Sequence, residues 1–401
     1  YGYYCYIIAC NFLHITTSFN FNFNCIIYLQ EKLFFGGFKA AMNITIFLGA
    51  GASAAENLPI QNELFSQYFK YILPKNKDTR MNKELTKFFK DLFFIDVTSD
   101  VDSINFPTFE EVLGVLDLAE QKRESFKNYK SESYNDNNTS ISYIRQSLIM
   151  LTAYTLNNAN SRSNSYHKLL LENLSKQNML QNTTFISANY DIHIDNAIAS
   201  LYDANKFPVM LNYGIDFTNF NMSKNSWQKP IEPMINLYKI HGSLNWLYCP
   251  ICNSITITPY EGGVMRIIEN IKQAKCLNCG ELTIPIIVPP TYFKNMSNVF
   301  LSTVWNKSER ALRESDLLIF CGYSFPEADM HIKYLLKRVQ TSRLKEKLKV
   351  IVVNNHAKKR NSLREKEKNR YERFLGKDVV YTEYSFEEFA DNPKKIIDLA
   401  K

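Results

Sequence analysis

Short apolar runs alternate with amphipathic stretches along most of the chain, and several runs end in polar residues. The run at residues 43–48 leads into a glycine turn and then into a helical pattern. Further apolar runs end beside polar residues at 183–188, 237–240, 316–322 and 349–353. Strands that alternate with helices are typical of a parallel sheet covered by helices. The pattern therefore predicts an α/β fold.

A long helical stretch interrupts this alternation between about residues 61 and 180. Thr108 followed by Glu111 predicts a capping box at the start of one of its helices. A polar stretch at 122–138 predicts a surface loop or the tip of the insertion. After a short strand at 379–382, the chain is predicted to close with one helix over residues 387–401.

The first 41 residues differ in composition from the rest. They are rich in Tyr, Phe, Asn and Ile, residues with A/T-rich codons, and Met42 directly precedes the first convincing strand. We interpret residues 1–41 as a non-native or upstream-translated extension and residues 42–401 as one domain. A membrane span needs about 20 consecutive apolar residues, and Asn11 and Asn20 are among the residues that interrupt every candidate run.

The formal net charge of +7 is modest, and the basic residues are scattered. The strongest basic run, at 358–370, is interrupted by Glu365 and Glu367. This mixture favours a solvated helix face over a nucleic-acid patch, and direct nucleic-acid binding stays open. No secretory signal is convincing, so we expect a cytoplasmic protein.

The turn at Gly49, Ala50, Gly51 and Ser53 is a candidate phosphate-binding loop. Glycine lets a phosphate approach the backbone, and helix N–H groups attract anions. The third glycine of the dinucleotide fingerprint is absent, since Ala54 and Ala55 follow. By itself, the turn also fits an ordinary crossover between a strand and a helix. A phosphate-binding turn after the first strand of a parallel sheet is typical of Rossmann-like folds, so we predict a Rossmann-like sheet.

Polar side chains follow two further strands. Asn189 and Asp191 end the run at 183–188, and His241 ends the run at 237–240. Ligands of open parallel sheets bind beyond the carboxyl ends of the strands, so these side chains are expected to share a rim with the glycine turn. The alternatives are that Asn189 and Asp191 only cap the next helix and that His241 is an ordinary loop or core histidine.

Two Cys-x-x-Cys pairs, separated by twenty-three residues, predict a zinc site. They consist of Cys249 with Cys252 and Cys276 with Cys279. Four thiolates complete a tetrahedral Zn²⁺ site and leave no open position, so the zinc is predicted to be structural. We place a small zinc-ribbon module at about residues 246–285. Four unligated thiols are the alternative.

Taken together, these ordered motifs resemble the sirtuin superfamily. The glycine turn, Leu58-Pro59, the Asn189-Tyr-Asp191 motif, His241-Gly242, the cysteine pairs, Gly322-Tyr-Ser324 and the asparagine at 354 or 355 match its motifs in order. The resemblance implies NAD as the bound nucleotide. Gly49, Ala50, Gly51 and Ser53 would hold the diphosphate, and Gly322, Ser324 and Asn354 the adenosine half. Asp191 would meet the carboxamide, Asn189 would order the ribose and the attacking group, and His241 would act as base.

Departures from the deacylases of that superfamily point to another activity. Ala188 stands where they have glutamine, and Gln61-Asn62 where they have Phe-Arg. At 287–291 two prolines replace part of the strand that pairs with an acyl-lysine peptide, and proline lacks the N–H that strand addition needs.

The helical insertion resembles the NAD-cleaving sirtuin-like domains of bacterial antiviral defence systems. The resemblance implies an NAD⁺ hydrolase, a homo-oligomer and a possible HerA-type ATPase partner. Protein deacylation and non-catalytic sensing of NAD or ADP-ribose are the alternatives.

Overall fold

A computed structural model describes residues 41–131, 139–160, 165–203, 210–218, 234–258, 275–287, 298–327, 329–343, 346–355 and 359–400. Apart from Ala41, the predicted extension at the start of the chain lies outside these residues. Residues 42–401 form one compact unit. No helix in the described part of this unit is both long and apolar enough to cross a bilayer.

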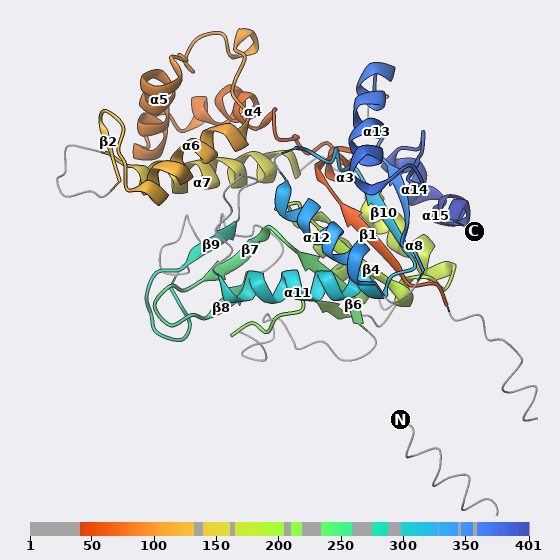
Figure 1. Cartoon of the computed structure of the whole chain (residues 1–401). Coiled ribbons are helices and arrows are strands. Elements are labelled where there is room, and N and C mark those ends of the chain that lie inside the picture. The colour runs from red at the N-terminus through yellow and green to blue at the C-terminus, as the bar shows by residue number, and fades with distance from the viewer. Residues whose placement is uncertain are drawn as a thin grey trace, which may run out of the picture. The chain divides into compact units, whose positions relative to one another are not determined.

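A seven-stranded parallel sheet lies at the centre of the unit (Figure 1). Its strands are β1 (Ile44–Leu48), β4 (Thr183–Ser187), β5 (Met210–Asn212), β6 (Met234–Lys239), β10 (Leu317–Cys321), β11 (Lys349–Val353) and β12 (Val380–Tyr381). Their order is β12-β11-β10-β1-β4-β6-β5. The chain thus builds outward from β1 first on one side and then on the other, which confirms the predicted Rossmann-like α/β fold. β5 was not predicted.

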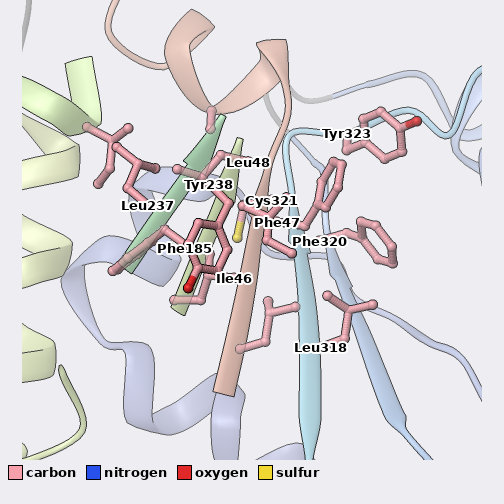
Figure 2. Packing of buried hydrophobic residues seen from close by; sticks show 14 of the residues in the cluster. Ile46, Phe47, Leu48, Phe185, Leu237, Tyr238, Leu318, Phe320, Cys321 and Tyr323 are labelled. Atoms are coloured by element: carbon pink, nitrogen blue, oxygen red, sulfur yellow. The ribbon is translucent and has the colours of Figure 1, made fainter. Parts of the chain in front are cut away.

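The central strands are buried on both faces, which explains why they read as continuous apolar runs. All five residues of β1 are buried, as are all five of β10. β1 pairs in register with β10 and with β4, so that Leu48 lies beside Cys321 and Ser187. Figure 2 shows the side chains of these strands packed into one apolar cluster. Cys321 lies fully buried inside this cluster, where it packs as a small hydrophobic side chain.

Helices cover the sheet in two packed groups. α8 packs against α9 and α14, and α11 packs against α12. The helices associated with the sheet are α3 (Ala50–Ala54), α8 (Tyr166–Lys176), α9 (His193–Asp203), α11 (Val299–Glu314), α12 (Met330–Ser342), α13 (Asn361–Leu375), α14 (Phe386–Asp391) and α15 (Pro393–Ile397). The predicted single closing helix is wrong: Asn392 ends α14 and caps α15, and Pro393 starts α15. Proline lacks the N–H that a continuous helix would need.

The helical insertion has an apolar core of its own. It contains α4 (Leu64–Tyr71), α5 (Arg80–Phe93), α6 (Phe109–Lys122), the strands β2 (Tyr129–Lys130) and β3 (Thr139–Ser140), and α7 (Ile141–Asn160). Aromatic rings fill this core, with Phe89 near Phe65 and Phe69 at centroid distances of 4.9 and 5.1 Å. The capping box predicted from Thr108 and Glu111 is present at the start of α6. α8 does not share this core, because its leucines pack with the sheet.

A three-stranded antiparallel sheet carries the cysteines. It consists of β7 (Gly242–Tyr248), β8 (Ile255–Ile257) and β9 (Ile284–Ile287), with β7 in the middle. β7 begins directly after His241 and ends directly before Cys249. One strand therefore joins the predicted base to the first predicted zinc ligand. Of the proline-containing stretch at 287–291, only Ile287 lies within the described residues.

Candidate functional site

A cavity of about 550 Å³ lies at the carboxyl ends of the central strands. Every residue predicted to be catalytic or to bind the nucleotide lines it: Gly49, Ala50, Gly51, Ser53, Asn189, Asp191, His241, Gly322, Ser324 and Asn354. Parallel strands end at one edge of a sheet, which explains how residues from distant segments meet there. Asn355 does not line the cavity; its side chain donates to Glu383 O at 2.7 Å.

The two glycine turns of the cavity cross at very short range. Gly51 N donates to Gly322 O at 2.8 Å, and a Cβ on Gly51 would lie 2.8 Å from Gly322 Cα. A Cβ on Gly322, which has a φ of +62°, would lie 2.0 Å from Ala52 N. The glycines therefore have a packing role besides the predicted phosphate contact: only residues without a side chain allow this crossing.

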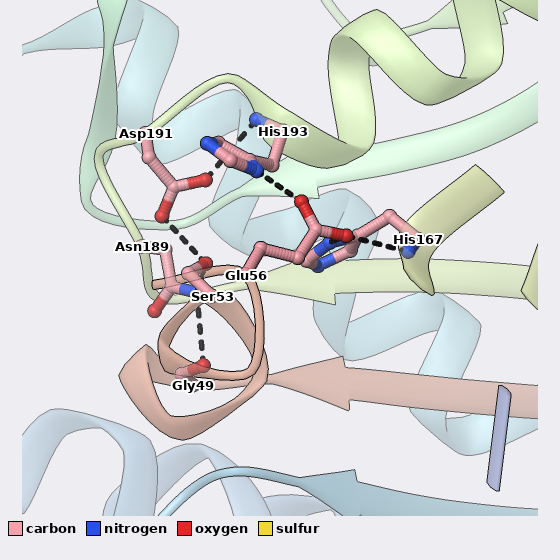
Figure 3. A network of polar contacts seen from close by, with 7 residues as sticks. All are labelled: Gly49, Ser53, Glu56, His167, Asn189, Asp191 and His193. Carbon is pink, nitrogen blue, oxygen red and sulfur yellow. Dashed lines mark hydrogen bonds and ion pairs between the residues drawn. The ribbon is translucent and has the colours of Figure 1, made fainter. Parts of the chain in front are cut away.

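Hydrogen bonds fix the amide of Asn189 at the end of β4 (Figure 3). Its Nδ2 donates to Gly49 O at 2.9 Å and to Ser53 Oγ at 3.0 Å. Figure 3 shows its Oδ1 turned away from both partners. An amide held this way presents its oxygen as a hydrogen-bond acceptor.

Asp191 is buried, and both of its carboxylate oxygens accept hydrogen bonds. Ser53 Oγ donates to Oδ2 at 2.8 Å, and His193 N donates to Oδ1 at 3.1 Å. Burial alone would raise the pKa of Asp191, but the charges of His193 and Lys239 and the Ser53 hydrogen bond hold it below its usual value. Asp191 is therefore ionised at neutral pH. It both bonds to the first residue of α9, as the capping alternative required, and lines the cavity.

His241 lies in the turn between β6 and β7 and is 2 % exposed. Its Nδ1 lies 3.2 Å from the carbonyl oxygen of Ala188. A carbonyl only accepts, so this bond places the proton on Nδ1 and the lone pair of the neutral ring on Nε2. Backbone next to Asn189 thereby sets the tautomer that a general base needs.

The side of the cavity at β10 and β11 is organised by a buried carboxylate. Asn354 Nδ2 donates to Tyr323 O at 3.1 Å and to Glu367 Oε2 at 2.9 Å. Lys359 Nζ pairs with Glu367 Oε1 at 2.9 Å. Asn354 Oδ1 is buried and has no hydrogen-bond partner among the described residues. Asn354 therefore offers an acceptor that a ligand hydroxyl can satisfy.

α7 of the helical insertion covers one flank of the cavity. Thr152 and Leu156 line the cavity itself. On the same helix, Ile149 and Ala153 form a small apolar cluster with residues of the antiparallel sheet. The other buried members are Leu244 and Ile287, and Tyr190 and Leu156 pack against the cluster. The insertion thus reaches across the Asn189–Asp191 loop to the cysteine-bearing sheet.

The four predicted zinc ligands converge at the far end of β7. Cys249 Sγ lies 3.5 Å from Cys279 Sγ, and Cys252 Sγ lies 3.5 Å from Cys276 Sγ. None is in a disulfide. A tetrahedral site with metal–sulfur distances of about 2.3 Å has edges of about 3.8 Å, so the thiols fit Zn²⁺. Hydrogen bonds with Ser254 and Asn278 lower the pKa of the Cys252 thiol to about 6, whereas burial and the neighbouring thiols raise the pKa of Cys279 to about 12. The convergence of the four thiols therefore supports the metal site, and their pKa values do not decide it.

Residues 183–372 match the model of the SIR2-like domain. The chain is similar to this family over that stretch, which spans a little under half of its length. The match begins at β4 and ends within α13, so the first glycine turn lies outside it. A search of curated proteins gives no match.

Solved structures similar to the chain include three from the Sir2 group. A Sir2 homologue in complex with NAD is 14 % identical over 90 % of this chain and 92 % of the other, with a TM-score of 0.42. A Sir2 homologue mutant with ADP-ribose is 14 % identical over 90 % and 94 %, with a TM-score of 0.39. Sir2 bound to an acetylated peptide is 13 % identical over 91 % and 97 %, with a TM-score of 0.37.

The sequence analysis missed the buried charged residues that pack beside the residues lining the cavity. Glu56, His167 and His193 form one buried cluster, and Lys359 pairs with Glu367 beside Asn354. The only local signal was charge in positions next to the motifs. Their pairing joins segments far apart in the chain, which periodicity does not report.

Proposed function

We propose that the chain hydrolyses NAD⁺ to nicotinamide and ADP-ribose. The cavity offers a pair of features suited to this reaction: an ordered amide oxygen on Asn189 and an imidazole on His241 whose Nδ1 is held by the carbonyl oxygen of Ala188. In the reaction, the oxygen of water bonds to the anomeric carbon and the bond from that carbon to the pyridinium nitrogen breaks. Nicotinamide leaves as a neutral molecule, and the proton of water passes to His241 and then to solvent.

In this proposal Asp191 meets the carboxamide of nicotinamide. Its carboxylate is ionised and fixed by Ser53 and by the backbone of His193. Asn189 Oδ1 accepts a hydrogen bond from the ribose or from the attacking water. General-base help of this kind contributes about 10²–10⁴-fold to a rate.

The position of α7 is the observation that favours hydrolysis of NAD⁺ over protein deacylation. Ile149 and Ala153 pack against Leu244 and Ile287, so a helix of this chain occupies the flank between the parallel sheet and the cysteine-bearing sheet. An extended peptide needs an open groove and free backbone groups for strand addition. A water molecule needs neither.

The decisive experiment measures NAD⁺ loss by the purified chain without any peptide, with nicotinamide and ADP-ribose separated by chromatography. His241→Ala should cut turnover by about 10²–10⁴-fold. His331→Ala, at a half-buried position of α12 outside the cavity, is the matched control and should keep the parent rate. Turnover by His241→Ala at the parent rate would refute the assignment.

The same assay separates the other activities. Product formed only when an acyl-lysine peptide is added, as O-acyl-ADP-ribose, would indicate deacylation. Tight NAD binding without product would indicate a sensor.

The biological setting forms part of the proposal. We infer that NAD⁺ depletion serves bacterial antiviral defence, with a homo-oligomer and a HerA-type ATPase as candidate assembly. The resemblance of the helical insertion supports this. Loss of NAD⁺ in infected cells that carry the parent chain, but not in cells that carry His241→Ala, would be the expected result.

A further inference from the structure

Behind the proposed NAD site, a single carboxylate lies between two imidazoles (Figure 3). Glu56 follows α3 and is 3 % exposed. Its Oε1 accepts hydrogen bonds from the backbone N and from Nδ1 of His167, each at 2.7 Å. Its Oε2 accepts from Nδ1 of His193. One buried carboxylate is thus satisfied by three donors from two helices.

The ionisation of this cluster favours a charge pair. Burial would raise the pKa of Glu56, but the hydrogen bonds to His167 and His193 lower it to about 2. Burial would lower the pKa of His193, but the hydrogen bond to Glu56 and the charge of Asp191 raise it above its usual value. A buried carboxylate with a protonated imidazole is a strong, directional interaction.

The same three side chains could be considered as a metal site, because their ligand atoms lie within 4.8 Å of one another. A metal about 2 Å from each donor holds the donors about 3 Å or more apart. Glu56 instead lies at hydrogen-bond distance from both rings. The geometry therefore favours direct pairing.

The cluster joins the two segments that hold Asp191. α3 has only five residues and no side-chain cap, so it has little stiffness of its own. Ser53 on α3 donates to one oxygen of Asp191, and His193 at the start of α9 donates its backbone N–H to the other. Glu56 ties these two segments together through His193 and ties both to α8 through His167.

We propose that Glu56 is a positioning residue that, through His193 and the turn carrying Ser53, fixes the carboxylate of Asp191 toward the nicotinamide end of NAD. This inference depends on the proposed function, in which Asp191 meets the carboxamide. Glu56 touches no substrate; it sets where Asp191 lies. A misplacement of about 1 Å at a reacting centre costs about 10²-fold in rate.

The test uses Glu56→Gln, which keeps the shape of the side chain and removes its charge. We expect Glu56→Gln to fold and to have a kcat about 10- to 100-fold lower than that of the parent. The matched control is Glu309→Gln on α11, which removes a carboxylate paired with Arg313 and Arg338 outside the cavity. It should leave kcat within twofold of the parent.

A second readout needs no turnover. Calorimetry should show that Glu56→Gln weakens binding of NAD more than binding of ADP-ribose, since only NAD carries the nicotinamide. If the parent binds NAD without cleaving it, the proposed function fails while this comparison still decides the inference. Equal weakening of both ligands would overturn the positioning role.

Variants of His193 cover the case in which Glu56→Gln does not fold. His193→Asn keeps a donor near the position of Nδ1, whereas His193→Ala does not. His193→Asn should retain a kcat at least about 10-fold above that of His193→Ala; equal rates would overturn the proposal. A zinc content that falls from two ions per chain to one in Glu56→Gln would also overturn it, in favour of a metal site.

Discussion

Substitution of Gly322 by alanine tests the crossing of the two glycine turns. Its φ of +62° is unfavourable for alanine, which costs about 1–2 kcal/mol. The new Cβ would also lie 2.0 Å from Ala52 N, a backbone atom that cannot rotate away. Forced displacement of packed groups costs about 1–3 kcal/mol. We therefore expect Gly322→Ala to lower the free energy of unfolding by about 2–5 kcal/mol.

Urea unfolding followed by tryptophan fluorescence measures this change, because Trp246 and Trp305 pack with the core of the parallel sheet. Gly280→Ala is the matched control: its φ is +79°, but nothing lies within 4 Å of the added Cβ. The control isolates backbone strain, so the difference between the two variants measures the clash. If Gly322→Ala is no less stable than Gly280→Ala, the crossing is looser than described and the reasoning is refuted. NAD binding should also fall in Gly322→Ala, since both turns line the cavity.

Three further predictions concern other parts of the molecule. The stabilisation from ionised Glu56 is fully present above its ordinary pKa of 4.5 and disappears as pH falls through about 2. The stabilisation from protonated His193 is fully present below its ordinary pKa of 6.5 and disappears as pH rises through its raised pKa in the folded protein. Glu56→Gln should therefore lose up to about 3 kcal/mol near pH 5.5 and less at pH 9, and equal losses in urea unfolding at both would contradict this. Removal of zinc by a chelator should shift the fluorescence of Trp246, which lies on β7 between the cysteines and the cavity. Unchanged emission from the metal-free protein would contradict a structural role for the zinc. Phe89→Ala should lower the free energy of unfolding of the insertion core by about 3–5 kcal/mol. Hydrogen exchange should then become faster in α4–α7 and change little in the parallel sheet. Equal acceleration in both regions would show that the two cores are not separate.

Local patterns predicted much of the fold. Continuous apolar runs located β1, β4, β10 and β11, because buried parallel strands have no polar face. The shared edge of the sheet then placed Asn189 and His241 in one cavity with the glycine turn. The capping box of α6 and the convergence of the four cysteines also followed from short-range spacing.

What the sequence could not show depends on contacts between distant segments. β5 has only three residues, too few for a periodic signal. Glu56 meets His167 at a separation of 111 residues, and no local pattern reports such a pair. The catalytic roles of Asn189, Asp191 and His241 stay predictions, tested by the variants above.

The separate cores of the insertion and the parallel sheet have an evolutionary consequence. The buried residues of one cluster do not belong to the other, and α7 also contributes Ile149 and Ala153 to a third, small cluster. Phenylalanines of the insertion core that do not line the cavity, such as Phe88 and Phe89, should therefore vary with little constraint from the reaction. Selection should instead concentrate on the stripe of α7 that lines the cavity and packs against the cysteine-bearing sheet.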